Sequence, residues 1–164
     1  MIPRTLYDSD HEMFRDSLRK FIDVEAMPHH EQWEKDGMVS DEIWLKAGEQ
    51  GFLCPMIPEE HGGLGTDFRY NCIVNEEIGR SGCTGLGWTL HNDITVPYIV
   101  RYGSEEQKKK YLPRCITGEL ITAIAMTEPG AGSDLQGTHT TAVLDGDHYI
   151  LNGSKTFITN GQKA

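Results

Sequence analysis

The stretch "ELITAIAMTEPGAGSD", residues 119–134, divides the chain into two kinds of sequence. Before it, apolar residues recur every three or four positions, as they do in amphipathic helices. Its first nine residues form a short apolar run rich in Ile and Thr, which is typical of a buried strand. Pro129, Gly130 and Gly132 then form a flexible loop. The stretch therefore predicts a change from α to β structure, with polar groups where the strand ends.

About five helices are expected before this change. The first begins at "SDHE", residues 9–12, which has the form of a capping box, and Pro28 is expected to end it. The second begins at the capping residue Ser40 and ends at Gly51. Its buried face is predicted to contain Ile43, Trp44 and Ala47.

The remaining three helices follow similar signals. The third begins at Thr66 or Asp67, and the fourth covers much of residues 85–102 with a bend near Pro97. The fifth has a capping box in "GSEEQKKKYLP", residues 103–113, in which Glu105 and Lys109 have the spacing of an ion pair.

Two hairpin signals follow the change. "TTAVLDGDHYIL" predicts two strands around Asp145 and Gly146, and "YILNGSKTFIT" predicts a second turn at Asn152 and Gly153. With residues 119–127 this makes four strands. The predicted fold class is α+β. An all-helical domain at 1–118 is followed by the first part of an antiparallel β domain at 119–164, and the chain is expected to stop inside that domain.

Charge and composition exclude several functions. A net charge of −10 argues against nucleic acid or an anionic membrane as a partner, because both select basic surfaces. The four cysteines form no C-x-x-C pair, which indicates reduced thiols and no zinc knuckle. No apolar run reaches the length of a membrane span, and the N-terminus has no targeting pattern. The expected location is cytoplasmic, or the mitochondrial matrix if a transit peptide has been removed.

The loop after the apolar run is the main candidate site. Thr127 would present a hydroxyl at the strand's end, and Ser133 adds another. Gly130 and Gly132 would allow an unusual backbone whose N–H groups bind an anion such as a pyrophosphate. The residues alone favour a simpler alternative, a β-turn whose polar side chains bond their own backbone.

Four segments, in order along the chain, resemble motifs of the acyl-CoA dehydrogenase family. "AMTEPGAGSD" at 125–134 and "NGSKTFITNG" at 152–161 resemble its two flavin-contact segments. "IPEEHGGLG" at 57–65 and "GSEEQKKKYLP" at 103–113 look like landmarks of its helical domain. The first segment together with Phe157 is most similar to the long-chain branch.

The resemblance implies an FAD-dependent enzyme that oxidises fatty acyl-CoA to trans-2-enoyl-CoA. In that family a glutamate removes the α-proton while the β-hydride passes to flavin N5. By resemblance, Met126 and Thr127 line the flavin's pyrimidine side, and Phe157 and Thr159 flank the isoalloxazine. Ser133 matches a position near both the pyrophosphate and the acyl-CoA.

Other implications concern parts outside this sequence. The family's catalytic glutamate has no match here and is expected beyond residue 164, so Glu128 is interpreted as a structural carboxylate. A C-terminal helical bundle, a homotetramer and electron-transferring flavoprotein as acceptor are implied for the full-length enzyme of fatty acid β-oxidation. Phe157 and Ile124 replace larger aromatic residues that many relatives carry.

Two alternatives remain open at this point. The chain could come from an acyl-CoA oxidase or flavin monooxygenase of the same fold, or it could be an inactive fragment without flavin. Two other groups of residues invite a functional reading. His91 and Asp93 imitate part of a catalytic triad without a nucleophile elbow. The pair His29 and His30 lacks metal-ligand spacing.

Overall fold

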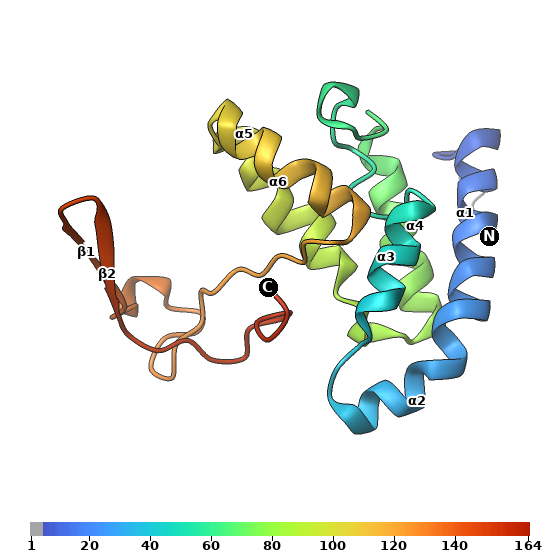
Figure 1. Ribbon diagram of the computed structural model, residues 1–164. Coiled ribbons are helices and arrows are strands. Elements are labelled where there is room, and N and C mark those ends of the chain that lie inside the picture. The colour runs from blue at the N-terminus through green and yellow to red at the C-terminus, as the bar shows by residue number, and fades with distance from the viewer. Residues whose placement is uncertain (1–4) are drawn as a thin grey trace. The chain divides into compact units, whose positions relative to one another are not determined.

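The structure, a computed structural model, describes residues 5–164 and contains two compact units that divide between Thr122 and Ala123. The first unit is helical and the second contains an antiparallel hairpin (Figure 1). The predicted fold class, helices followed by the start of an antiparallel β domain, is therefore confirmed.

The first helical stretch continues further than the sequence predicted. Helix α1 (Ser9–Phe21) passes through a π-helical turn, η1 (Ile22–Ala26), into α2 (Met27–Asp36). Pro28 lies in the first turn of α2 and does not end the helix, because a missing N–H is tolerated there. The capping residue is Asp8 and not Ser9: its carboxylate accepts the N–H of His11 at 3.2 Å, so the box lies one residue earlier.

Helices α3 (Asp41–Glu49) and α4 (Phe68–Ser81) begin where the sequence predicted. Ser40 occupies the capping position of α3, but its side chain makes no cap hydrogen bond. Asp67 caps α4 through its carboxylate. The face predicted to be buried in α3 is buried, since Ile43, Trp44 and Ala47 are each at most 2% exposed.

A second π-helical turn comes directly before the last two helices. That turn, η4 (Leu90–Thr95), leads directly into α5 (Val96–Tyr102), and Pro97 lies in the first turn of α5, where its missing N–H is tolerated. Helix α6 (Glu105–Thr117) begins with the predicted capping box of Ser104 and Gln107. Three short 3₁₀ turns complete the connections: η2 (Glu59–His61), η3 (Thr84–Leu86) and η5 (Leu135–Gly137). Glu105 pairs with Lys108 at 2.9 Å and not with Lys109, because the side chain three residues away lies closer.

The helices of the first unit pack around an aromatic and aliphatic core. Helix α1 packs on α4, and α6 packs on α3 and α5. Trp44 and Trp88 are at most 1% exposed and meet edge to face with ring centroids 6.4 Å apart. Gly48 and Gly118 allow α3 and the end of α6 to approach closely, since a Cβ on either would lie 2.3 Å from a backbone oxygen of the other segment.

A buried carboxylate ties α1 to α4. Glu77, 1% exposed, accepts from Arg15 at 3.1 Å, from Arg19 at 2.8 Å and from Arg80 at 2.6 Å. Burial alone would raise the pKa of this carboxyl. The three guanidinium groups outweigh burial and lower the pKa to about 2.

The first predicted hairpin is present in the second unit. Strands β1 (Thr141–Asp145) and β2 (His148–Asn152) pair antiparallel, with Asp145 opposite His148. The two connecting residues are therefore Gly146 and Asp147, one position later than predicted. Gly146 has a φ of +65° and Asp147 has no positive φ, which fits a type II′ turn with glycine at its first central position.

The other two predicted strands are absent from residues 5–164. Residues 121–127 form no ladder, because a strand needs a neighbour joined by backbone hydrogen bonds, and in this segment only Thr127 O receives one, from Thr156 N–H. The second hairpin also fails to form. Phe157 (φ +54°) and Asn160 (φ +63°) lie in the left-handed region, which interrupts an extended strand. No helix in the described part of the chain is both long and apolar enough to cross a membrane.

Candidate functional site

Two loops of the second unit, far apart in sequence, are joined by hydrogen bonds. We call residues 125–134 the first loop and residues 152–161 the second loop. The N–H of Thr156 donates to the carbonyl of Thr127 at 3.0 Å. The ammonium of Lys155 donates to the carbonyl of Met126, also at 3.0 Å. The structure therefore brings together the two segments that carry all of the predicted site residues.

Glu128 is the polar centre of this junction. It is 6% exposed, and its backbone exchanges two hydrogen bonds with Ala131, at 2.9 and 3.1 Å, which close a tight turn. Its carboxylate accepts from Lys155 at 2.8 Å and from the backbone N–H groups of His139 at 2.7 Å and Thr140 at 2.9 Å. Two other segments of the unit, residues 139–140 and the second loop, thus converge on this side chain.

These donors decide what Glu128 can do chemically. The bond from Lys155, followed by the backbone bonds, holds the pKa of the Glu128 carboxyl far below its usual range. Such a carboxylate is a poor proton acceptor near neutral pH. The geometry therefore favours the structural role expected for Glu128 over a role as general base.

Lys155 was missed by the sequence analysis. It is the only cation of the second loop, and its side chain is 22% exposed. The available signal was charge complementarity, since Glu128 is an acid at the end of an apolar run and needs a partner if buried. Sequence alone gave no indication that this acid would be buried.

The glycines of the first loop differ from the prediction. Neither Gly130 nor Gly132 has a positive φ, so the loop does not form the left-handed nest proposed for an anion. A Cβ on either glycine would have no atom within 4 Å. The chain's own packing therefore leaves free space beside both positions.

The other predicted site residues are open to solvent. Phe157 is 93% exposed although its backbone is in the left-handed region, and Ser133 and Thr159 are also exposed. Met126 is 47% exposed. Within residues 5–164, no hydrogen bond joins Ser133, Phe157 or Thr159 to another predicted site residue. The structure thus links the loops through Met126, Thr127 and their neighbours only.

His91 and Asp93 form no catalytic pair. His91 is fully buried, and its Nε2 lies 3.0 Å from the carbonyl of Cys115, which can only accept, so Nε2 carries the proton. Its Nδ1 lies 2.9 Å from the hydroxyl of Thr122. Burial lowers the pKa of His91 to about 4, so the ring is neutral at pH 7. Asp93 instead accepts from two asparagine side chains of α4.

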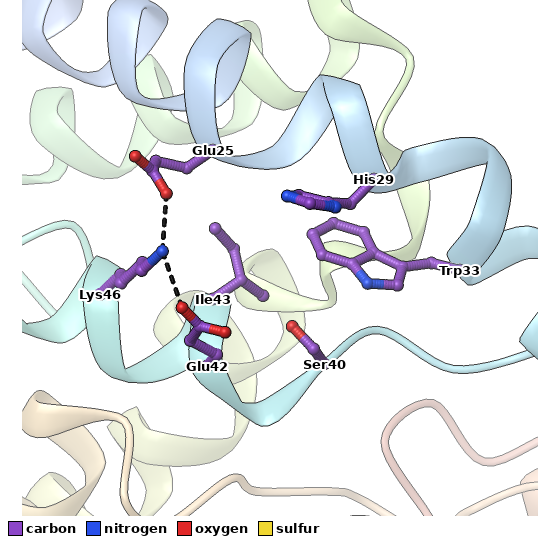
Figure 2. A pocket seen from close by; sticks show the side chains of 7 residues that line it. All are labelled: Glu25, His29, Trp33, Ser40, Glu42, Ile43 and Lys46. Carbon is purple, nitrogen blue, oxygen red and sulfur yellow. Dashed lines mark hydrogen bonds and ion pairs between the residues drawn. The ribbon is translucent and has the colours of Figure 1, made fainter.

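A cavity of about 180 Å³ lies between the η1–α2 stretch and α3 (Figure 2). Lys46 projects between Glu25 and Glu42 and lies 2.8 Å from each carboxylate, which raises the pKa of the lysine. The ring of His29 lies beside that of Trp33, with centroids 5.7 Å apart. Ser40 and Ile43 complete the lining. Because its charged groups largely satisfy one another, we interpret this cavity as a joint between helices.

The structure offers neither an activated thiol nor a metal cluster among the described residues. All four cysteines are free, and burial raises the pKa of each thiol, so none is a ready thiolate. No group of three or more His, Cys, Asp or Glu side chains in residues 5–164 could hold a metal ion. The joined loops are therefore the best candidate site.

Comparison with known proteins shows the family of this chain. Residues 8–119 match the acyl-CoA dehydrogenase N-terminal domain, and residues 123–164 match the acyl-CoA dehydrogenase middle domain. The chain belongs to the acyl-CoA dehydrogenase family. Both joined loops lie inside the middle-domain match.

Individual relatives are similar over almost the whole chain. The mitochondrial long-chain specific acyl-CoA dehydrogenase of Sus scrofa is 57% identical over 158 residues, which are 96% of this chain and 37% of that protein. A crystal structure of acyl-CoA dehydrogenase from Geobacillus kaustophilus is 57% identical with a TM-score of 0.93, over 97% of this chain and 42% of that one.

A second similar structure is described as a complex with a cofactor. It is acyl-CoA dehydrogenase complexed with FAD from Bacillus anthracis, at 38% identity and a TM-score of 0.85. The match covers 98% of this chain and 28% of that one. This chain therefore spans less than half the length of each of these relatives.

Proposed function

We propose that this chain is the N-terminal portion of an FAD-dependent acyl-CoA dehydrogenase that converts fatty acyl-CoA to trans-2-enoyl-CoA. The observation that carries the proposal is the junction of the two loops through Lys155 and Thr156. These loops contain every residue that the family resemblance assigns to the flavin. A flavin site built from two loops requires this proximity.

The exposed groups of the two loops fit a flavin. The N–H groups of Met126 and Thr127 have no hydrogen-bond partner among residues 5–164 and can donate to an electron-rich ring edge. Phe157 offers an aromatic ring that is 93% exposed, which suits stacking against a planar ligand. Thr159 adds an exposed hydroxyl. We assign these four residues to binding the isoalloxazine.

Bound FAD would accept the hydride from the acyl β-carbon at flavin N5. The contribution of this chain is to bind and polarise. Donors from Met126 and Thr127 would stabilise negative charge that develops on the ring, because fixed dipoles in a partly dry site act strongly. Ser133, beside the free space at Gly132, is assigned to the pyrophosphate and the acyl-CoA.

Removal of the α-proton is assigned to a glutamate outside residues 1–164. Glu128 is unsuited to that step because its carboxylate is held ionised by three donors. We therefore propose that these 164 residues do not turn over alone. The domain limits proposed for function are 1–118 for the helical domain and 119–164 for the part of the β domain present here.

The substrate class and partners follow from the family. Long-chain acyl-CoA is proposed because the Sus scrofa relative is named long-chain specific. A homotetramer and electron-transferring flavoprotein as acceptor are proposed on resemblance alone. The mitochondrial name of that relative favours the matrix over the cytoplasm.

The proposal is tested by FAD binding to the full-length enzyme that carries this sequence. Thr127→Ala and Thr159→Ala are expected to weaken FAD affinity by about tenfold each, because a lost hydrogen bond to a ligand costs roughly 1.4 kcal/mol. Thr117→Ala on α6 is the control, since its hydroxyl bonds only the carbonyl of Arg114. If the wild-type enzyme binds no FAD, the proposal is wrong.

A further inference from the structure

Lys155 makes contacts that go beyond a simple ion pair. Its ammonium donates both to the Glu128 carboxylate, at 2.8 Å, and to the Met126 carbonyl, at 3.0 Å. It therefore bridges a side chain and a backbone group of the first loop from a position in the second loop. With only 22% of its side chain exposed, the bridge is partly shielded from water.

The bridge changes which backbone groups remain available. Lys155 occupies the Met126 carbonyl, and the N–H of Thr156 occupies the Thr127 carbonyl at 3.0 Å. Both acceptors at positions 126 and 127 are thus used inside the chain. The two N–H groups and the Thr127 hydroxyl have no hydrogen-bond partner among residues 5–164. The segment at 126–127 therefore offers donors to a ligand.

We propose that Lys155 is a positioning residue for the flavin: it fixes the backbone at Met126 and Thr127 so that this segment presents hydrogen-bond donors to the reduced ring. This inference rests on the proposed function. Because reduction adds negative charge to the flavin, fixed donors stabilise the reduced form more than the oxidised form. Lys155 would thereby raise the reduction potential of the bound flavin without touching the ring.

Glu128 fits this proposal as the anchor of the bridge. It is held by two backbone N–H groups and cannot follow a displaced lysine. The ammonium is therefore fixed at one end by Glu128 and fixes the Met126 carbonyl at the other. A lysine with only a stabilising role would need the carboxylate but not the bond to Met126.

The test compares flavin potentials in the full-length enzyme loaded with FAD. Lys155→Met removes the charge and both hydrogen bonds, while Lys155→Gln keeps a neutral donor. Lys109→Met on α6 is the matched control, since Lys109 is exposed and far along the chain from both loops. The flavin absorption spectrum and the thermal unfolding of the apoproteins are measured alongside.

In Lys155→Met, we expect the affinity for reduced flavin to fall at least tenfold more than the affinity for oxidised flavin. For a two-electron couple this is a shift of about 30 mV to more negative potential. Lys155→Gln should shift in the same direction, and Lys109→Met should match the wild type. Potentials and spectra that are unchanged in both Lys155 variants would overturn the inference.

Variants that bind no flavin are also informative. If a Lys155 variant binds no flavin but its apoprotein unfolds at the wild-type temperature, the result supports positioning. If it binds no flavin and its apoprotein unfolds at a lower temperature, the role of Lys155 is purely structural and the inference is overturned. A wild-type enzyme without flavin would instead refute the proposed function. The two failures are therefore distinguishable.

Discussion

Single residues decide how closely segments of the second unit pack. Gly153 approaches Thr140 so closely that a Cβ on it would lie 2.2 Å from the threonine hydroxyl and 2.7 Å from its Cα. Gly132 has no neighbour within 4 Å of the same hypothetical atom. One glycine is thus required by the chain's own packing, whereas the other leaves space that a ligand can use.

Alanine substitutions separate these two roles. Gly153→Ala should reduce the free energy of unfolding of the second unit by about 2 kcal/mol, because the neighbouring backbone has to move. Gly132→Ala should leave that free energy unchanged and weaken FAD or acyl-CoA binding. Chemical denaturation and FAD titration of both variants measure the two effects. Equal losses of stability would contradict the assignment.

At the residue scale, Glu77 makes the free energy of unfolding depend on pH. Its pKa falls from an ordinary 4.5 to about 2 in the folded chain, so its contribution is complete above about pH 4.5 and is lost as pH falls toward 2. Glu77→Gln should cost on the order of 3 kcal/mol near neutral pH, because three guanidinium groups lose a shared buried counter-charge. Acid denaturation of both proteins should show this difference shrinking toward pH 2. A difference that is constant with pH would show that the charge is unimportant.

At the scale of elements, local signals predicted helices better than strands. Capping boxes, such as that of Ser104 and Gln107, and apolar spacing on α3 depend on neighbours within one helix, so sequence suffices. The run at 119–127 has strand composition, but a ladder depends on a partner segment that its own sequence does not specify. The left-handed backbone at Phe157 likewise has no local signal.

In the candidate site, too, the local features could be predicted from the sequence and the long-range contacts could not. The motifs predicted which loops matter, and the turn at Glu128 follows from Pro129 and Gly130. The bridge from Lys155 to Met126 joins residues 29 positions apart and depends on packing. Such a contact is not determined by the spacing of residues within either motif.

Two helical glycines test the packing of α3 against α6. Gly48→Ala should destabilise the protein by about 1–2 kcal/mol, because the Thr117 carbonyl oxygen lies 2.3 Å from the new Cβ and outweighs the better helix propensity of alanine. Gly79→Ala on α4 is the control, with no atom within 4 Å, and should stabilise by about 0.5–1 kcal/mol. Thermal and urea unfolding measure both. Stabilisation by both substitutions would contradict the close approach.

At the scale of the whole molecule, the two units differ in how much they bury. The first unit contains the aromatic core around Trp44 and Trp88, whereas every residue of β1 and β2 is exposed. A hairpin without a packed face is marginally stable in water. The 164 residues therefore combine a self-supporting helical unit with a β unit that has little core of its own.

Hydrogen exchange of the isolated 164-residue chain should show this difference. Backbone amides in α4 are expected to exchange at least a hundredfold more slowly than those of β1 and β2, because local opening of the hairpin exposes little new surface. Exchange measured by mass spectrometry at several times resolves the two groups. Equal protection of α4 and the hairpin would contradict the described burial.

The joined loops are proposed to belong to a flavin enzyme that acts on fatty acyl-CoA. The most direct test adds palmitoyl-CoA, without oxygen, to the full-length enzyme loaded with FAD, and follows the flavin absorbance. We expect rapid bleaching with palmitoyl-CoA and much slower bleaching with a short branched acyl-CoA. A protein that binds no FAD, or a bound flavin that stays oxidised with palmitoyl-CoA, would contradict it.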